Sequence, residues 1–163
     1  MVGLTADLVQ GQYTISQISG ETTLQLPFGS MVMQGTNDDQ MVSLNTQTPT
    51  KLLGIIEYNG AYQINHQIGN VADTNGNIGI LPNITAGVKR RGRIWVYTDE
   101  AVTVGAAVRV RTTTAGGGFG TFRKTASTGV TLLLKSANWV YAAAANGPAL
   151  LEFDMVSMTF TAD

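Results

Sequence analysis

The clearest alternation of hydrophobic and polar residues lies in the segment 92–112, which reads GRIWVYTDEAVTVGAAVRVRT. In its first half, β-branched residues occupy every second position, as one face of a β-strand requires. Arg93, Trp95 and Tyr97 occupy the other face. Because long polar and aromatic side chains line that second face, we expect it to meet water or a polar partner and not a second core.

The alternation is interrupted twice within this segment and then resumes. Two acidic residues at positions 99–100 and Gly105 mark turns, and Arg109 and Arg111 alternate with valines after them. The pattern predicts a strand, a turn, a short strand, a second turn and a further strand. The side chains expected to point inward are Ile94, Val96, Val102, Val104, Val108 and Val110.

Several shorter strands are predicted before this segment. Alternating apolar residues at 24–26 and 31–33 flank a Pro-Phe-Gly sequence that separates two strands. A turn rich in Asn and Asp at 35–39 leads into a strand that begins at Val42. The run LLGIIEY at 52–58 is interpreted as a buried strand, because two isoleucines and an internal glycine are unfavourable in so short a helix.

Two stretches lack a clear strand pattern. Residues 1–20 are interpreted as an extended N-terminal arm, with a frayed terminus as the alternative. Residues 59–86 are rich in Asn, Gly, Gln and Thr and are interpreted as a long loop with hairpin turns, which makes them a candidate contact surface. The remainder of the chain, 21–163, is predicted to be one β domain that contains this loop.

Short strands separated by turns also fill the C-terminal part of the chain. They are predicted at 131–134, 139–141, 150–155 and 158–161, after a glycine-rich turn region. The total is about ten short strands with hardly any helix, which is typical of an all-β barrel or sandwich. We therefore predict a single-domain β-barrel or β-sandwich.

The charge balance bounds the choice of partner. Ten basic and eleven acidic residues give a net charge of −1. Such a chain has no overall field that would recruit nucleic acid or a membrane surface, so neither is expected as a partner. Only 13% of the residues are charged, well below the usual share. A surface with so few charges suggests that much of it is covered when the protein works.

Cysteine is absent, which excludes disulfides and thiolate metal sites. The N-terminal residues lack the basic and apolar regions of a signal peptide, and no apolar run reaches the ~18 residues of a membrane helix. We expect a soluble protein that is made in a cytoplasm.

Candidate catalytic chemistry is sparse. The single histidine, His66, has neither a cysteine nor a second histidine as partner, so we interpret it as a hydrogen-bonding loop residue and not as a catalytic base or zinc ligand. The carboxylate pairs Asp38-Asp39 and Asp99-Glu100 lie at predicted turns, where solvated acids are ordinary. No catalytic, cofactor-binding or metal-binding residue is therefore predicted.

Two segments together resemble the paired signatures of the bacteriophage capsid cement, or head decoration, proteins. They are LPFGSMVMQGTNDDQMVSL at 26–44 and GRIWVYTDEAVTVGAAVRVR at 92–111. Between them, Leu-Gly-Ile at 53–55 is similar to a strand of that family. After them, Gly-Thr-Phe-Arg at 120–123 and the hydrophobic-acidic final strand at 150–155 are also similar, and the order of all these elements is preserved.

The resemblance implies an all-β structural protein of the virion, synthesised in the host bacterial cytoplasm. Such a protein binds the exterior of the assembled capsid and bridges subunits of the major capsid protein. The resemblance implies neither enzymatic activity nor a cofactor. The alternative is a carbohydrate- or receptor-binding β-domain of a phage tail or fibre.

The residues expected at an interface are Arg93, Trp95, Tyr97, Arg109 and Arg111. The three arginines lie on strands that are expected to be neighbours, so their guanidinium groups could converge on one patch and pair bidentately with carboxylates. The alternative is that they are solvated charges that keep a sheet edge from aggregating. Low charge together with aromatic groups on the outer face also predicts self-association as a dimer or trimer.

Overall fold

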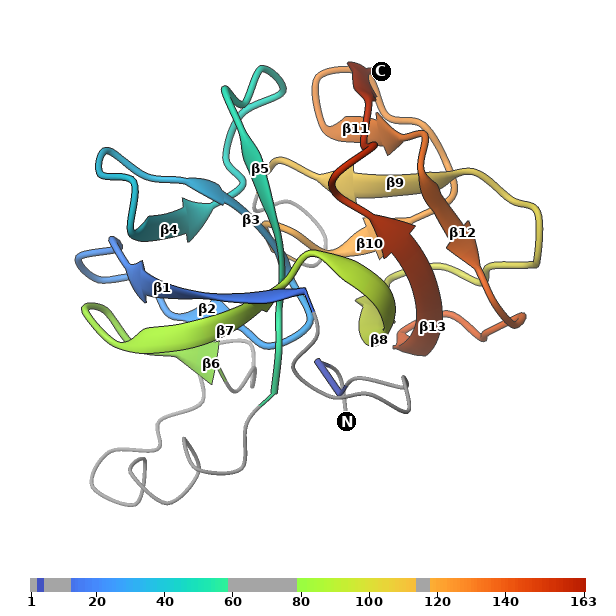
Figure 1. Ribbon diagram of the computed structural model, residues 1–163. Coiled ribbons are helices and arrows are strands. Elements are labelled where there is room, and N and C mark those ends of the chain that lie inside the picture. The colour runs from blue at the N-terminus through green and yellow to red at the C-terminus, as the bar shows by residue number, and fades with distance from the viewer. Residues whose placement is uncertain (1–2, 5–12, 59–78, 114–117) are drawn as a thin grey trace.

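The computed structural model describes residues 3–4, 13–58, 79–113 and 118–163. Within these ranges the chain forms strands and turns and no helix, so the prediction of an all-β single domain is confirmed. Fourteen strands are present, more than the number expected, because several have only two or three residues. Figure 1 shows a barrel on the left, in blue to green, beside a second sheet on the right, in yellow to red. The fold therefore combines a small closed barrel with an open sheet.

The barrel contains five strands in the order β1-β4-β3-β5-β7. It closes where β7 pairs antiparallel with β1, from Thr14 opposite Lys89 to Ile18 opposite Thr85. Gly54 of β5 lies against β7, with φ of +152°, and a Cβ at this position would collide with the Lys89 carbonyl. The strands are β1 Thr14–Ser19, β3 Met31–Gln34, β4 Gln40–Ser43, β5 Leu52–Ile56 and β7 Thr85–Lys89.

The second sheet has seven strands in the order β12-β13-β8-β10-β9-β11-β14. Its longest ladder joins β13 and β8, antiparallel over eight pairs from Gly147 opposite Thr98 to Asp154 opposite Arg91. A separate pair, β2 Leu26–Pro27 and β6 Gly79–Ile80, forms a two-stranded sheet. The seven strands are β8 Arg91–Thr98, β9 Val108–Arg111, β10 Phe122–Arg123, β11 Thr131–Leu134, β12 Ala137–Trp139, β13 Gly147–Asp154 and β14 Phe160–Ala162.

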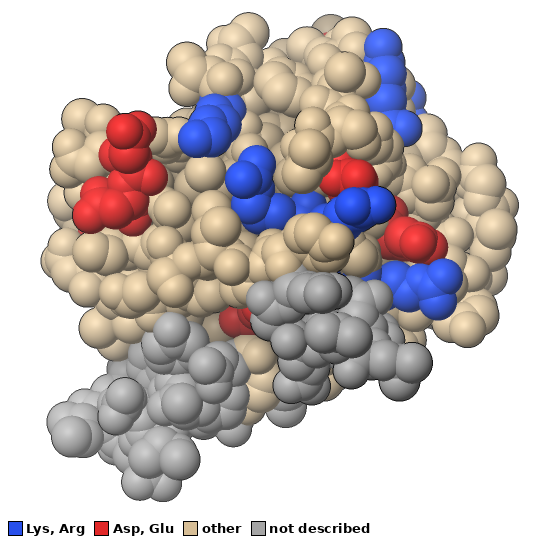
Figure 2. Space-filling model, in the orientation of Figure 1, with Lys and Arg blue, Asp and Glu red and all other residues tan. Residues whose placement is uncertain are grey.

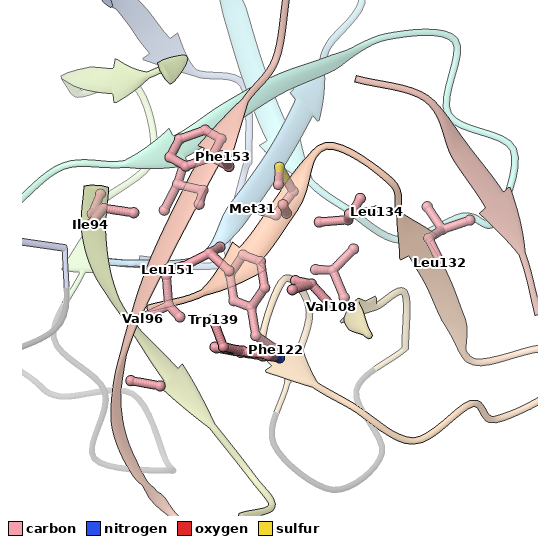
Figure 3. Packing of buried hydrophobic residues seen from close by; sticks show 14 of the residues in the cluster. Met31, Ile94, Val96, Val108, Phe122, Leu132, Leu134, Trp139, Leu151 and Phe153 are labelled. Carbon is pink, nitrogen blue, oxygen red and sulfur yellow. The ribbon is translucent and has the colours of Figure 1, made fainter. Parts of the chain in front are cut away.

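Two hydrophobic clusters hold the fold together, one centred on the second sheet and one in the barrel. The larger cluster joins the two parts, because Met31 of β3 packs among side chains of the second sheet, including Phe153 and Leu134 (Figure 3). Trp139 is buried within this cluster, and its indole N–H donates to the Ala107 carbonyl at 3.2 Å. Full burial of each such side chain contributes roughly 1.5–3 kcal/mol, so this cluster fixes the second sheet against the barrel.

The predicted inward face of segment 92–112 is confirmed at all positions but one. Val102 is buried and forms an isolated bridge with Ala143, but Val104 is 65% exposed. The alternation fails because residues 103–106 form a tight turn, in which the Ala106 amide donates to the Thr103 carbonyl and Gly105 has φ of +82°. A turn reverses the chain, so every second residue no longer shares a face.

The segments expected to be an arm and a long loop contribute strands. Within 1–20, residues 14–19 form β1 of the barrel, and residues 3–4 bind their own domain. The sequence pattern hid β1 because its most buried positions are polar, namely Gln17 and Ser19. Within 59–86, residues 79–80 form β6, and β7 begins at residue 85. Residues 5–12 and 59–78, which include His66, lie outside the described residues.

Candidate functional site

Two cross-strand ion pairs lie on the outer face of β8 and β13, where β8 starts and β13 ends. Arg91 lies opposite Asp154, with 3.4 Å between Nε and Oδ2, and Arg93 lies opposite Glu152, with 3.2 Å between Nη2 and Oε2. The Arg91 guanidinium also lies over the ring of Tyr13, 5.3 Å from its centroid. Both arginine side chains are about half exposed. This half of the face therefore presents charges of both signs to solvent.

The other half of the same face is aromatic and uncharged. Trp95 lies opposite Leu150, and Tyr97 lies opposite Pro148. Both aromatic side chains are partly buried, and the Tyr97 hydroxyl donates to Asn146 Oδ1 at 3.4 Å. The aromatic groups predicted on the outer face are thus present, although neither is fully exposed.

The N-terminal residues bind alongside the aromatic half. The Gly3 amide donates to the Trp95 carbonyl at 2.5 Å, and the Trp95 amide donates to the Leu4 carbonyl at 2.9 Å. The Gly3 carbonyl in turn accepts from the Tyr58 amide at 2.8 Å. These hydrogen bonds fix residues 3–4 between β8 and the end of β5.

An open recess of ≈ 290 Å³ lies beside the ion pairs. Its walls come from the start of β8, the end of β13 and strand β12, and carry both basic and acidic groups. A recess of this kind suits a polar or charged group of a partner better than an apolar one. The lining residues are Arg91, Gly92, Ser136, Asn138, Glu152, Phe153 and Asp154.

Arg111 of β9 is enclosed. Its guanidinium binds the Asp99 carboxylate, at 2.6 Å from Nε and 2.5 Å from Nη2 to the same oxygen. The two side chains are 10% and 9% exposed. Arg123 approaches the other Asp99 oxygen at 3.9 Å. Arg111 is therefore committed to an ion pair within the chain that holds the turn after β8 against β9.

The carboxylate of Glu100, the residue after Asp99, is held by hydrogen bonds from the segment that follows β10. It accepts hydrogen bonds from the Lys124 amide at 2.5 Å and from the Thr125 amide and hydroxyl at 2.5 and 2.8 Å. The Arg123 guanidinium lies 3.5 Å away. Partial burial raises the pKa of Glu100, but the hydrogen bonds from Thr125, Lys124 and Arg123 outweigh burial and hold its pKa below the ordinary value. Glu100 thus stays ionised and fastens the turn after β8 to the turn after β10.

Arg109 is bound to the C-terminal end of the chain. Its Nε donates to both oxygens of the Asp163 side chain, at 3.1 and 2.9 Å, and its Nη1 donates to the Lys124 carbonyl at 2.6 Å. The Thr131 hydroxyl donates to the same Asp163 carboxylate at 2.6 Å. Only 16% of the Arg109 side chain is exposed. Arg109 therefore joins β9 to the residue that follows β14.

The expectation that the strand of Arg93 is the neighbour of the strand of Arg109 and Arg111 is wrong. Strand β10 lies between β8 and β9, and Arg93, Arg109 and Arg111 bind three different carboxylates. The reason is a long-range insertion, because Phe122 of β10 pairs with both Thr98 of β8 and Val110 of β9. Figure 2 shows small groups of charged side chains, in some of which basic and acidic side chains are neighbours, on a largely uncharged surface.

The described part of the chain offers few groups for other chemistry. No cluster of three or more His, Cys, Asp and Glu side chains that could hold a metal ion is found among the described residues. Asp38 forms an exposed hydrogen bond with Gln34, as expected for a residue in a turn. The described residues contain no helix of the length and hydropathy needed to cross a membrane.

Comparison with known proteins places the chain in a family. No match was found among curated proteins. One protein-family model does match, that of the structural cement protein (E217 gp24/Pam3 gp6), over residues 3–154. The matched range runs from the first described residue to the end of β13, and so takes in strands of both the barrel and the second sheet. The resemblance to capsid cement proteins is therefore confirmed, and the chain belongs to this family of phage structural cement proteins.

Proposed function

We propose that this protein binds the outer surface of the assembled phage head and bridges neighbouring subunits of the major capsid protein. The observation that carries the proposal is the family match over residues 3–154, which identifies a structural cement protein of phage. The work of such a protein is adhesion, so we assign it no catalytic residue, cofactor or metal. It acts on the exterior of the virion after synthesis in the cytoplasm of the host bacterium.

The outer face of β8 and β13 is the capsid-contacting surface in this proposal. Arg93 supplies a half-exposed guanidinium beside the open recess, and Trp95 and Tyr97 supply a partly exposed aromatic area next to it. Mixed charges give orientation and salt dependence to an encounter, while aromatic groups contribute most of the contact energy at many interfaces. A partner with acidic groups opposite Arg93 and an apolar patch opposite Tyr97 would fit this face.

Arg109 and Arg111 take an indirect part in the proposed interface. Their low exposure and their carboxylate partners favour a role in holding the second sheet in shape. We therefore propose that they position the surface and that Arg93 contacts the partner.

Multivalent attachment would make modest contacts sufficient. A copy that touches two capsid subunits, or that associates with another copy as a dimer or trimer, converts later contacts into intramolecular ones of high effective concentration. Bridging then resists outward displacement of capsid subunits, because two bridged subunits cannot move apart until one of the attachments has broken.

Co-sedimentation with purified heads that lack the protein tests this proposal. We expect saturable attachment to the heads and a higher temperature of head disruption after attachment. A matched sample of detergent-disrupted capsid subunits would show whether the assembled lattice is required. Absence of attachment to heads, together with specific binding on a glycan array, would contradict the proposal and favour the tail-domain alternative.

A further inference from the structure

A surface without charged residues lies at one end of the second sheet. Residues 101–108 and 136–151 contain no Asp, Glu, Lys, Arg or His. Within them, the turn between β8 and β9 and the loop between β12 and β13 lie side by side at the right-hand edge in Figure 1, bridged by Val102 and Ala143. We call residues 101–107 and 140–148 the uncharged end.

Two of the seven large hydrophobic side chains that are exposed in the described residues lie on the uncharged end. Val104 is 65% exposed and Tyr141 is 62% exposed. Close to them in the sequence lie small exposed residues. Scattered single apolar residues need no explanation, but a contiguous apolar patch usually marks an interface. The small exposed residues are Ala101, Gly105, Ala107, Ala142, Ala144 and Ala145.

The uncharged end is held in place by the domain beneath it. Val102 and Ala143 exchange two backbone hydrogen bonds, of 2.9 and 3.0 Å. The buried Trp139 binds the Ala107 carbonyl, and Tyr97 binds Asn146. Because both loops are already tied to each other and to the sheet, little ordering is needed when a partner binds. Alanine also loses no side-chain rotamer entropy on burial.

We infer that the uncharged end docks onto the same surface of a second copy of this chain, across a two-fold axis. In such a contact each residue near the axis faces its own counterpart, so any charge would meet a like charge. The uncharged end has no such repulsion, whereas self-pairing of the Asp38-Asp39 turn would bring like charges together. Small residues let two backbones approach closely around Tyr141 and Val104.

This inference rests on the proposed function for its setting, because it names the surface through which neighbouring copies of the cement protein associate. It also assigns self-association to a different surface from the one that the sequence predicted. Self-association was predicted from Trp95 and Tyr97, but both are partly buried, and the most exposed aromatic group in this part of the sheet is Tyr141.

A charge-insertion experiment on the full-length chain tests the inference. The double variant Val104→Glu with Tyr141→Glu places carboxylates on both sides of the axis. We expect the wild type to show a concentration-dependent rise in mass by sedimentation velocity, and the double variant to associate at least about tenfold more weakly. Both side chains are exposed, so thermal unfolding should be nearly unchanged.

Val156 supplies the matched control. It is 75% exposed, but it lies beyond the far end of β13, and its amide binds the Asp154 carboxylate at 2.9 Å. Val156→Glu should associate like the wild type. Equal association of the wild type and the double variant would overturn the inference, as would a wild type that remains monomeric both in solution and on heads.

A cross-linking experiment tests the two-fold contact directly. The chain has no cysteine, so Tyr141→Cys carries the single thiol. A short bis-maleimide should link two copies of Tyr141→Cys, in solution or on heads, and should link Val156→Cys several-fold less. Cross-linking of neither variant would overturn the inference.

Attachment to heads separates this inference from the proposed function. A double variant that remains associated but no longer attaches to heads would show that the uncharged end faces the capsid, and would overturn the inference while the proposed function stands. A wild type that associates through this end but never attaches to heads would support the inference and contradict the proposed function.

Discussion

Two sets of arginines in the second sheet have nearly the same sequence pattern and opposite surroundings. Arg91 and Arg93 alternate along β8 and form half-exposed pairs with Asp154 and Glu152. Arg109 and Arg111 alternate along β9 in the same way, but their side chains are only 16% and 10% exposed. Alternation sets which face of a strand a residue occupies, and the covering segments decide whether that face meets water.

The difference arises from the segments that pack around each strand. Strand β8 pairs with β13 on one side, and its outer face stays open along the ion pairs. Strand β9 is flanked by β10 and β11, and the turns at 99–100 and 124–125 and the C-terminal Asp163 close over its arginines. The arginines of β9 therefore form enclosed ion pairs, whereas those of β8 form ion pairs that are half exposed to solvent.

The largest expected effect is that of replacing Arg111. Arg111→Gln removes the main partner of Asp99, a carboxylate with only 9% exposure. An uncompensated enclosed charge is costly, so we expect the free energy of unfolding to fall by about 3 kcal/mol. Urea unfolding of the variant measures this change. A loss of unfolding free energy no greater than that of Arg93→Gln would show that the enclosed and the half-exposed arginines contribute equally to stability.

The second effect concerns the pair of Arg109 and Asp163. We expect a double-mutant cycle with Arg109→Gln and Asp163→Asn to give a coupling energy of about 1 to 2 kcal/mol, because Nε donates a charge-assisted hydrogen bond shared by both Asp163 oxygens and the pair is little exposed. The matched cycle with Arg93→Gln and Glu152→Gln should give less than about 1 kcal/mol, since both side chains are near half exposed. Equal coupling energies in the two cycles would contradict the comparison.

The third effect is a pH dependence that comes from Glu100. Its pKa in the folded protein lies below the ordinary value of 4.5, so its ionised form stabilises the fold above that pH. This stabilisation is lost as the pH falls through the lower folded value. The difference in unfolding free energy between the wild type and Glu100→Gln should therefore shrink as the pH falls below 4.5.

The control for Glu100 is Glu152→Gln, which alters a carboxylate in the open pair with Arg93. Its effect on stability should be small at every pH, because exposed ion pairs contribute little. A Glu100→Gln difference that grows as the pH falls would show that the hydrogen bonds from Thr125 and Lys124 do not favour the ionised form.

The smallest effect on stability belongs to Arg93. Arg93→Gln should change the free energy of unfolding by less than about 1 kcal/mol. Under the proposed function it should nevertheless weaken attachment to heads and make attachment less sensitive to salt. Lys51→Gln, which removes an exposed positive charge on the barrel side, is the control for net charge. Identical salt titrations for Arg93→Gln and the wild type would remove Arg93 from the proposed interface.

Much of the fold could be predicted because alternation along a strand is a local property of the sequence. The all-β class and the inward face of β8 depend on residues two positions apart, and five of the six predicted inward residues are buried. The family resemblance depended on short motifs in a preserved order, which is also a property of the sequence alone. Polar residues at buried positions hid β1, because Gln17 and Ser19 do not look like core residues.

The sequence by itself therefore determined the strand content, the two faces of β8 and the family of this protein. Only the tertiary structure decided that β10 separates β8 from β9, that Asp99 and Asp163 bind Arg111 and Arg109, and that Val104 lies exposed beside Tyr141's loop. The physical reason is that alternation along a strand depends on residues close in sequence, whereas the strand order depends on long-range contacts. Which strands lie side by side, and which loops cover them, depends on contacts between residues far apart in the chain, such as Arg109 with Asp163 and Val102 with Ala143.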